Sequence, residues 1–214
     1  MPRNREAGVR LTLVEKAAEL LMTNEPVTLR RVAAAAGTST MAVYTHFGGM
    51  PGLLRAVRQE GFTRLGARLR TMAGTDDPVR DAMALASGYA ANACTNPALY
   101  RAMFDTRYDL DDPLAADETF GALIGALGRA VEVGRFDPDT DPTGAAVELW
   151  AMAHGLIMLI LTGALPFPTL AEHLPSMAVA AFVGFGDDPA AARRSVDAGW
   201  SPPEPPSGAE PQPG

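Results

Sequence analysis

Residues 28–47, TLRRVAAAAGTSTMAVYTHF, constrain this chain most strongly, because they predict two short helices joined by a glycine turn. Thr28 is placed to cap the first helix with its hydroxyl oxygen. Gly37 follows the last apolar position of that helix, where glycine adopts a left-handed backbone at little cost. Ser39 starts the second helix. The segment therefore predicts a helix-turn-helix whose second helix enters the major groove of DNA.

The apolar residues of both predicted helices recur at helical spacing, which gives each helix one inward face. These inward positions are Leu29, Val32, Ala33 and Ala36 in the first helix, and Ala42, Val43 and Phe47 in the second. Arg30 and Arg31 are left on the outer side. Beyond the second helix, the pair Gly48-Gly49 is expected to end it, and Pro51 suits the first turn of another.

The rest of the chain also has helical periodicity, and no segment alternates as a strand does. Further helices are expected over residues 10–23, 51–73, 77–94, 97–107, 114–134, 143–163, 169–185 and 188–199. The sequence thus predicts an all-α fold in which a long helix joins a three-helix head to a helical body. We expect a flexible basic arm over 1–9, a DNA-binding head over 10–56, a body over 57–200 and a disordered proline-rich tail over 201–214.

Composition favours a globular protein of the cytoplasm. Hydrophobic residues make up 47% of the chain and charged residues 20%, and Cys94 is the only cysteine, which excludes an internal disulfide framework. No signal-peptide pattern is present. The longest apolar run, near 149–165, is interrupted by His154 and glycines, so we expect a buried helix rather than a membrane span.

The net charge of −7 hides an uneven distribution along the chain. Residues 1–70 carry 11 Lys and Arg against 5 Asp and Glu, whereas the remainder carries 7 against 20. A basic head can engage phosphates while the acidic remainder stays away from them. The charge distribution therefore agrees with the predicted helix-turn-helix.

With these motifs, the chain resembles the TetR family of bacterial transcription regulators over roughly residues 10–70. The matching positions are Ala17, Val32-Ala33, Gly37, Val43-Tyr44 and His46-Phe47. In the body, the segment ELWAMAHGLIML resembles the Trp-His-Gly signature of one group of TetR effector domains, through Trp150, His154 and Gly155.

The resemblance implies a homodimer with two DNA-binding heads and a ligand pocket in each body, with no cofactor. It places DNA contacts at Thr28, Arg30, Thr38, Ser39, Thr40, Met41, Tyr44, Thr45 and His46. Side-chain chemistry agrees with several of these roles. Arg30 can bind guanine through two hydrogen bonds, and threonines can meet base edges or thymine methyl groups. Tyr44 and His46 are better suited to phosphates.

One position departs from the family pattern. The family usually places Ser-Lys after the Phe and one variable residue, whereas this chain has Gly49-Met50. The lysine would offer a phosphate contact at the start of the fourth helix. Backbone N–H groups at that helix N-terminus still suit a phosphate, so we expect weaker binding rather than none.

Candidate ligand-binding residues are the bulky or polar side chains Tyr89, Tyr100, Met103, Phe104, Trp150 and His154. Trp150 and His154 lie one turn apart and share a helix face. They can line a pocket, with the imidazole bonded to a ligand and the indole stacked on it. Equally, the histidine can be a core residue bonded to a backbone carbonyl, with the tryptophan as filler. A mostly apolar cavity with a few polar groups would suit a small apolar or aromatic effector.

The sequence offers no support for catalysis or for a metal site. No spacing among the three histidines and Cys94 suggests zinc, and no nucleophile elbow, phosphate loop or catalytic carboxylate pair is found. We therefore expect a non-enzymatic, ligand-responsive regulator, more a repressor than an activator, that binds a near-palindromic double-stranded operator. The last two long helices would pair with their symmetry mates. The alternative is a small-molecule binding or sequestering protein whose head has lost specific DNA recognition.

Overall fold

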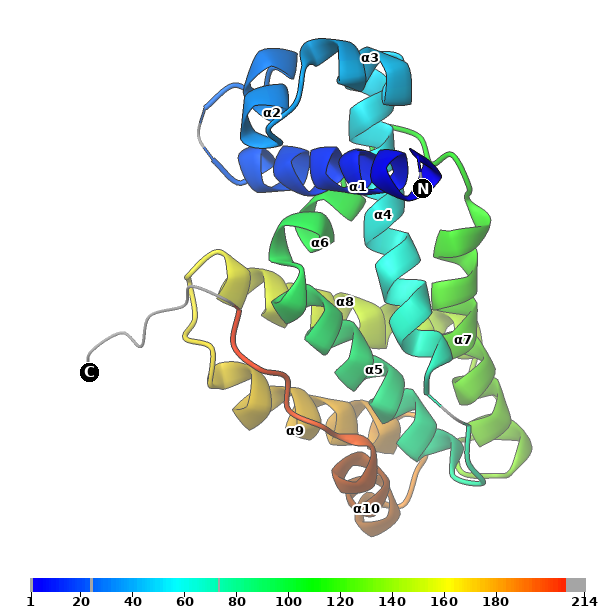
Figure 1. Ribbon diagram of the computed structural model, residues 1–214. Helices are drawn as coiled ribbons and strands as arrows, with labels where there is room; N and C mark the ends of the chain where they lie inside the picture. The colour runs from blue at the N-terminus through cyan, green and yellow to red at the C-terminus, as the bar shows by residue number, and fades with distance from the viewer. Residues whose placement is uncertain (1, 24, 73, 207–214) are drawn as a thin grey trace. The chain divides into compact units, whose positions relative to one another are not determined.

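The computed structural model describes residues 2–23, 25–72 and 74–206, with side chains from residue 7 onward. Within these ranges every regular element is an α-helix (Figure 1), as the sequence predicted. The helices are α1 (Pro2–Leu21), α2 (Leu29–Ala35), α3 (Thr40–Phe47), α4 (Met50–Arg70), α5 (Pro78–Thr95), α6 (Pro97–Met103), α7 (Leu114–Glu132), α8 (Pro142–Leu161), α9 (Thr169–Gly184) and α10 (Pro189–Gly199).

The helices form two units, which are described separately. Unit 1 comprises Met1–Arg64 and Asn96–Ala115, and unit 2 comprises Leu65–Thr95 and Ala116–Gly214. The division thus falls within α4, whereas we expected the head to end at residue 56. Helix α6 belongs to unit 1, although it follows α5 of unit 2 in the sequence.

The helix-turn-helix forms for the local reasons that the sequence indicates. The Thr28 hydroxyl accepts a hydrogen bond from the Arg31 N–H (3.3 Å) and caps α2. The Ser39 hydroxyl caps α3 in the same way, by accepting from the Ala42 N–H (3.3 Å). Between the two helices, Gly37 has φ +62°, a left-handed backbone that a residue with a Cβ adopts only with strain. The predicted caps and turn are therefore confirmed.

Helix α1 begins earlier than the sequence suggested. We expected a flexible arm over residues 1–9, but the helix extends from Pro2 to Leu21. Residues 2–9 contain no internal proline or paired glycine that would stop a helix from growing toward the N-terminus.

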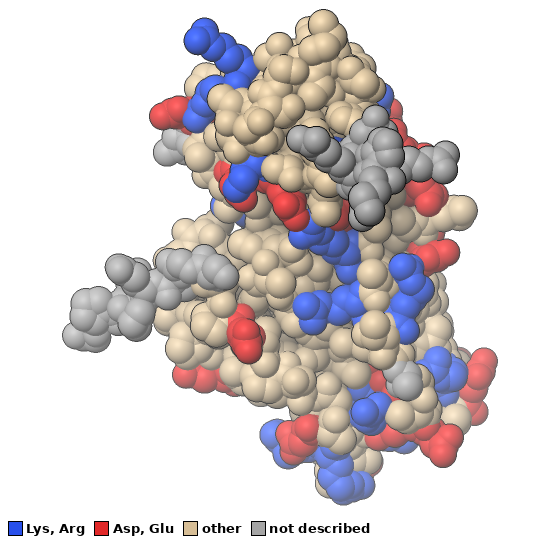
Figure 2. Space-filling model, in the orientation of Figure 1, with Lys and Arg blue, Asp and Glu red and all other residues tan. Residues whose placement is uncertain are grey.

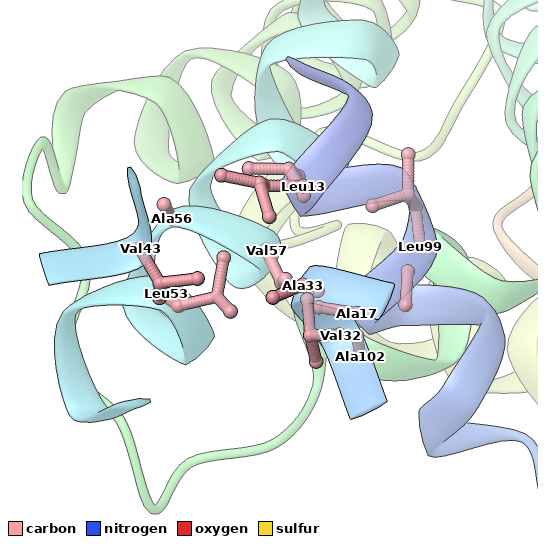
Figure 3. Packing of buried hydrophobic residues seen from close by; sticks show 12 residues of the cluster. Leu13, Ala17, Val32, Ala33, Val43, Leu53, Ala56, Val57, Leu99 and Ala102 are labelled. Carbon is pink, nitrogen blue, oxygen red and sulfur yellow. The ribbon is translucent and has the colours of Figure 1, made fainter. Parts of the chain in front are cut away.

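A hydrophobic core in unit 1 joins five of its helices (Figure 3). Helices α1, α2, α3, α4 and α6 all contribute buried side chains to it: Leu13, Val14, Ala17, Ala18, Val32, Ala33, Val43, Leu53, Ala56, Val57, Leu99 and Ala102. Most of these positions lie on the apolar faces read from the sequence. The contribution of Leu99 and Ala102 from α6 is tertiary, because no local pattern assigns that helix to the head.

Unit 2 is built around α5, which packs against α8, α9 and α10. Helix α5 is buried along most of its length, and α8 and α9 also pack against each other. Local signals start two of these helices. Asp141 caps α8 by accepting from the N–H groups of Thr143 and Gly144, and Asp188 caps α10 by accepting from that of Ala191.

Within the described ranges, α8 is the helix that is long and apolar enough to cross a membrane by length and composition. A helix packed inside a protein meets the same test. Leu149, Leu156 and Ile157 of α8 are buried in unit 2, where the helix lies against α5 and α9. The position of α8 thus agrees with the expectation of a packed helix.

An ionic cluster joins four segments of unit 2. Arg135, after α7, forms two hydrogen bonds to Asp187, before α10, at 2.8 and 2.7 Å. The same guanidinium reaches Asp77 at 3.1 Å, and the Ser195 hydroxyl of α10 donates to Asp77 at 2.6 Å. Figure 2 shows blue and red side chains side by side in this end of the unit, where α10 lies. The Asp187 side chain is only 1% exposed, and Arg135 supplies the ion pair within this buried setting.

Part of the predicted disordered tail has a defined course. Residues 201–206 follow α10 as an extended segment beside α5 (Figure 1), and Ser201 is hydrogen-bonded to Ser87. The expectation of disorder was therefore wrong for this stretch, because its prolines restrict the backbone and α5 supplies a partner. Residues 207–214 of the predicted tail lie outside the described residues.

Candidate functional site

Helix α3 presents an outer face of uncharged polar and apolar side chains. Val43 is buried beneath it, while Met41 and Tyr44 are 68% and 54% exposed. Thr40 and Thr45 are exposed as well, and the Thr45 hydroxyl donates to the Met41 carbonyl within the helix (3.0 Å). Because that hydroxyl oxygen retains acceptor capacity, Thr45 can still meet a base edge. The surface over α3 is mostly tan in Figure 2.

The other predicted DNA contacts lie around this face. Thr28, Arg30 and Ser39 are exposed, whereas Thr38 and His46 are half-buried. The His46 ring is tilted against Phe47, with centroids 6.1 Å apart. The hydroxyls of Thr28 and Ser39 also cap their helices, so both have a structural role whether or not they touch DNA.

Several basic side chains of unit 1 are engaged by carboxylates of the same unit. Lys16 pairs with Glu19, Arg31 with Glu25, Arg55 with Asp111, and Arg64 with Glu15 and Glu60. Among the described side chains, no carboxylate lies within ion-pair distance of Arg10 or Arg30, both of which are exposed. The charge offered to phosphates is therefore more localised than the sequence count suggests.

Arg10 was not singled out in the sequence, and the structure brings it to the end of α3. Its guanidinium carbon lies 5.3 Å from the centroid of the Phe47 ring, which is cation–π distance. No local motif signals this contact, because Arg10 and Phe47 are on different helices. Stacking on Phe47 holds a positive charge beside the recognition helix.

Gly49 and Met50, which depart from the family pattern, have structural roles at the start of α4. Gly49 is buried with φ +120°, and Met50 begins α4. The Met50 side chain packs against the hydrophobic core of unit 1. This position therefore contributes an apolar contact to the head, where the family pattern has a phosphate-binding lysine.

In unit 2, Tyr89 of α5 joins Trp150 and His154 of α8 through its hydroxyl. The Trp150 Nε1–H donates to the Tyr89 oxygen at 3.1 Å, and His154 Nδ1 lies 3.1 Å from the same oxygen. An indole N–H can only donate, so the Tyr89 oxygen accepts from Trp150. The Tyr89 hydroxyl and His154 Nδ1 share a second hydrogen bond, whose direction depends on the imidazole tautomer.

Tyr89, Trp150 and His154, here called the triad, have largely apolar surroundings. Tyr89 is 9% exposed, and the Phe120 ring meets the Trp150 ring edge to face at 5.8 Å. Burial lowers the pKa of His154 below its ordinary value of 6.5, because the imidazolium loses hydration. The sequence left two roles open for His154, a ligand-binding group or a core residue bonded to a backbone carbonyl. In the structure, the contact of His154 Nδ1 is with the Tyr89 hydroxyl.

The other three predicted ligand-binding residues belong to unit 1. Tyr100 and Met103 of α6 are fully buried there. The Phe104 ring meets Tyr100 edge to face at 5.4 Å and Phe62 at 6.3 Å. The six candidates are thus divided between the units: three form the hydrogen-bonded triad of unit 2, and three form an aromatic and thioether cluster in unit 1.

No group of three or more His, Cys, Asp or Glu in the described ranges could hold a metal ion. Acidic residues of the loop before α7 have partners within the protein. Asp111 pairs with Arg55 at 3.4 Å, and the backbone N–H of Asp112 donates to the Gln59 side chain at 2.9 Å.

A capped helix-turn-helix followed along the chain by a helical domain is typical of a DNA-binding transcription regulator. Residues 13–57 match the family described as bacterial regulatory proteins, tetR family. Residues 82–182, which include Trp150, His154 and Gly155, match the tetracyclin repressor-like C-terminal domain. The chain belongs to the TetR family.

Solved structures share this fold at low sequence identity. A putative TetR-family transcriptional regulator from Rhodococcus is 21% identical with TM-score 0.66, over 83% of this chain and 98% of that one. A gamma-butyrolactone receptor (ArpA-like protein) is 21% identical with TM-score 0.65, over 91% and 95%. RolR in complex with resorcinol is 18% identical with TM-score 0.59, over 93% and 98%. No curated protein matches the sequence.

Proposed function

We propose that this protein is a cytoplasmic, dimeric repressor that binds a near-palindromic operator and is released by a small apolar or aromatic effector. The observation that carries the proposal is the outer face of α3. A short helix, capped at its first turn and fixed by buried Val43, presents Met41 and Tyr44 to solvent with threonines beside them. Such a face suits base edges in the major groove.

The proposed DNA contacts divide by chemistry. Arg30 is the candidate for guanine, since it is exposed and can offer two parallel N–H donors. Thr40, Met41 and Thr45 would meet base edges and thymine methyl groups. Tyr44 and His46 would bind phosphates and fix the docking position, as would Thr38 and the caps Thr28 and Ser39 through side-chain or backbone groups.

Exposed small and apolar residues on α8 support a dimer. Val147, Ala151, Gly155 and Leu159 are exposed at intervals of four residues, so they form one stripe along the helix. On α9, Ser176, Ala180 and Gly184 are exposed at similar spacing. Two such stripes suit a four-helix interface with a second copy, because small side chains allow close approach. A dimer would bring two recognition helices to successive major grooves.

The triad in unit 2 supports the proposal that the protein binds a small effector. Trp150 supplies an aromatic surface, while Tyr89 and His154 supply polar atoms in an apolar setting. Tyr100, Met103 and Phe104 stay predicted ligand-binding residues within unit 1. Two proteins of similar fold are named for small organic ligands, a gamma-butyrolactone in one and resorcinol in the other. An effector releases the operator only if it binds the DNA-free arrangement more tightly.

A gel-shift experiment with the promoter of the protein's own gene tests the proposal. Specific binding that survives excess competitor DNA, and that Arg30→Ala abolishes, is the expected result. The packing of Met50 into the head favours one other function, a sequestering protein that no longer reads specific DNA. Binding that is equal for promoter and competitor, and that disappears with salt, would favour this second function and overturn the first.

A further inference from the structure

The chain beyond α10 has a backbone conformation that its own sequence imposes. Each residue of Ser201–Pro206, SPPEPP, is either a proline or the residue before one. Proline fixes φ near −65°, and the residue before a proline is held in the extended region. Trp200, where the segment begins, has φ −78° and ψ 131°. These angles are close to those of polyproline II.

Burial along this segment follows the same geometry. Trp200, Pro203 and Pro206 are half-buried, whereas Ser201, Pro202, Glu204 and Pro205 are exposed. Polyproline II has three residues per turn, so every third residue lies along one edge. We call the segment 200–206 the strap. One of its three edges contacts unit 2, and the other two edges are exposed.

Ser87 of α5 fixes the register of the strap. Its hydroxyl donates to the Ser201 carbonyl oxygen at 2.7 Å and accepts from the Ser201 N–H at 3.0 Å. The Ser87 side chain is buried, with 4% of the residue exposed. The backbone N–H and C=O of Ser201 are thus both bonded to the Ser87 hydroxyl. If the strap slid or detached, this buried hydroxyl would lose both hydrogen bonds.

The end of α10 brings the strap close to α5. A Cβ on Gly199 would lie 2.4 Å from the Arg80 carbonyl oxygen and 2.9 Å from the Met83 Cβ. Glycine is therefore required for this approach between the end of α10 and the backbone of α5. Gly199 and Ser201 contact α5 at successive turns, so the strap runs along the helix (Figure 1).

Ser87 and Tyr89 are two positions apart on α5, which places them about 200° apart around the helix axis. The strap therefore contacts α5 on one side, while Tyr89 reaches Trp150 and His154 of α8 on the other. We propose that the strap is a positioning element that holds α5 in the register needed for the Tyr89 hydroxyl to bond both side chains. Restricted polyproline II backbone suits this role, because little conformational entropy is lost when the strap docks.

The indole N–H resonance of Trp150 tests the proposal without effector or DNA. Because the chain has two tryptophans, Trp200→Phe serves only to assign the two indole signals, and all other variants keep Trp200. Tyr89→Phe then gives the position of the Trp150 resonance when the hydroxyl is missing. A chain ending at residue 200 and the Ser87→Ala variant are expected to move the resonance more than half of the way to this reference position.

Two controls separate the strap from general damage. A chain ending at residue 206 keeps the strap, and Ser201→Ala keeps both backbone groups that Ser87 binds. Both should leave the Trp150 resonance at its full-chain position. An unmoved resonance in Ser87→Ala overturns the proposal, as does one in a truncated chain that circular dichroism shows to be folded. Since no ligand is added, either result is independent of the proposed regulatory function.

Discussion

The hydroxyl oxygen of Tyr89 lies 3.1 Å from Nδ1 of His154, with α5 supplying one residue and α8 the other. The Trp150 indole donates to the same oxygen, and burial of the imidazole favours its neutral form. Helix α5 is thereby joined to α8 by polar contacts within an apolar setting. The protonation state of His154 should be a sensitive measure of this arrangement.

Acidification should destabilise the protein through His154. Its folded pKa lies below 6.5, so between 6.5 and that lower value the unfolded chain binds a proton that the folded chain does not. Stability is therefore lost as pH falls through this window. Thermal unfolding at about pH 7.5 and 5.5 should show a smaller loss of Tm in His154→Asn than in the parent chain. An equal loss in both would contradict the role given to His154.

Replacement of Arg10 should weaken DNA binding without changing its sequence preference. We expect the guanidinium stacked on Phe47 to contact phosphate rather than a base. In Arg10→Ala the slope of log affinity against log salt should fall by about 1, equally for operator and competitor DNA. Arg193→Ala, an exposed change on α10, is the control. A loss confined to the operator would instead indicate base recognition by Arg10.

Introducing the family's lysine at Met50 should strengthen DNA binding. The start of α4 would gain a charge that reaches phosphate, and the salt slope should rise by about 1 in Met50→Lys. Because the Met50 side chain packs on the core of unit 1, some loss of thermal stability should accompany the gain. Titrations at several salt concentrations measure the slope, and equal slopes in both proteins would count against this interpretation.

Removal of Asp187 should be costly for unit 2. Its buried carboxylate is bonded twice to Arg135, whose guanidinium also holds Asp77. Asp187→Ala leaves Arg135 without that partner, and the free energy of unfolding should fall by on the order of 3 kcal/mol. Asp197→Ala, on the exposed side of α10, should change it by less than about 0.5 kcal/mol. Urea unfolding of both variants decides whether the cluster stabilises the fold.

A charge in the exposed stripe of α8 should separate the proposed dimer. Ala151→Glu places a carboxylate between Val147 and Gly155, which an interface would have to desolvate. Light scattering at micromolar concentration should then report monomers with unchanged helix content. Ala198→Glu, the same change at an exposed site of α10, should remain dimeric. A dimer that persists in Ala151→Glu would place the interface elsewhere.

Several details of the DNA-binding face were predictable because their causes are local. Thr28 and Ser39 each cap the helix that follows by accepting from the N–H three residues ahead, and Gly37 takes the left-handed turn between the helices. Capping and turn preferences act over a few residues, so they are visible in the sequence. The ligand-binding candidates were less predictable. Tyr89 is 65 residues from His154, and no local pattern records their contact.

By itself, the sequence determined the helical periodicity, the caps and turn of the helix-turn-helix, and the resemblance that its motifs carry, since each depends on neighbouring residues. The tertiary structure alone decided that α6 packs in unit 1, that Arg10 stacks on Phe47, and that carboxylates pair with Arg31 and Arg64 of unit 1. It also decided that Ser201 binds Ser87, which gives part of the proline-rich tail a fixed course. Contacts between distant residues form only when packing of the apolar faces offsets the entropy of bringing them together.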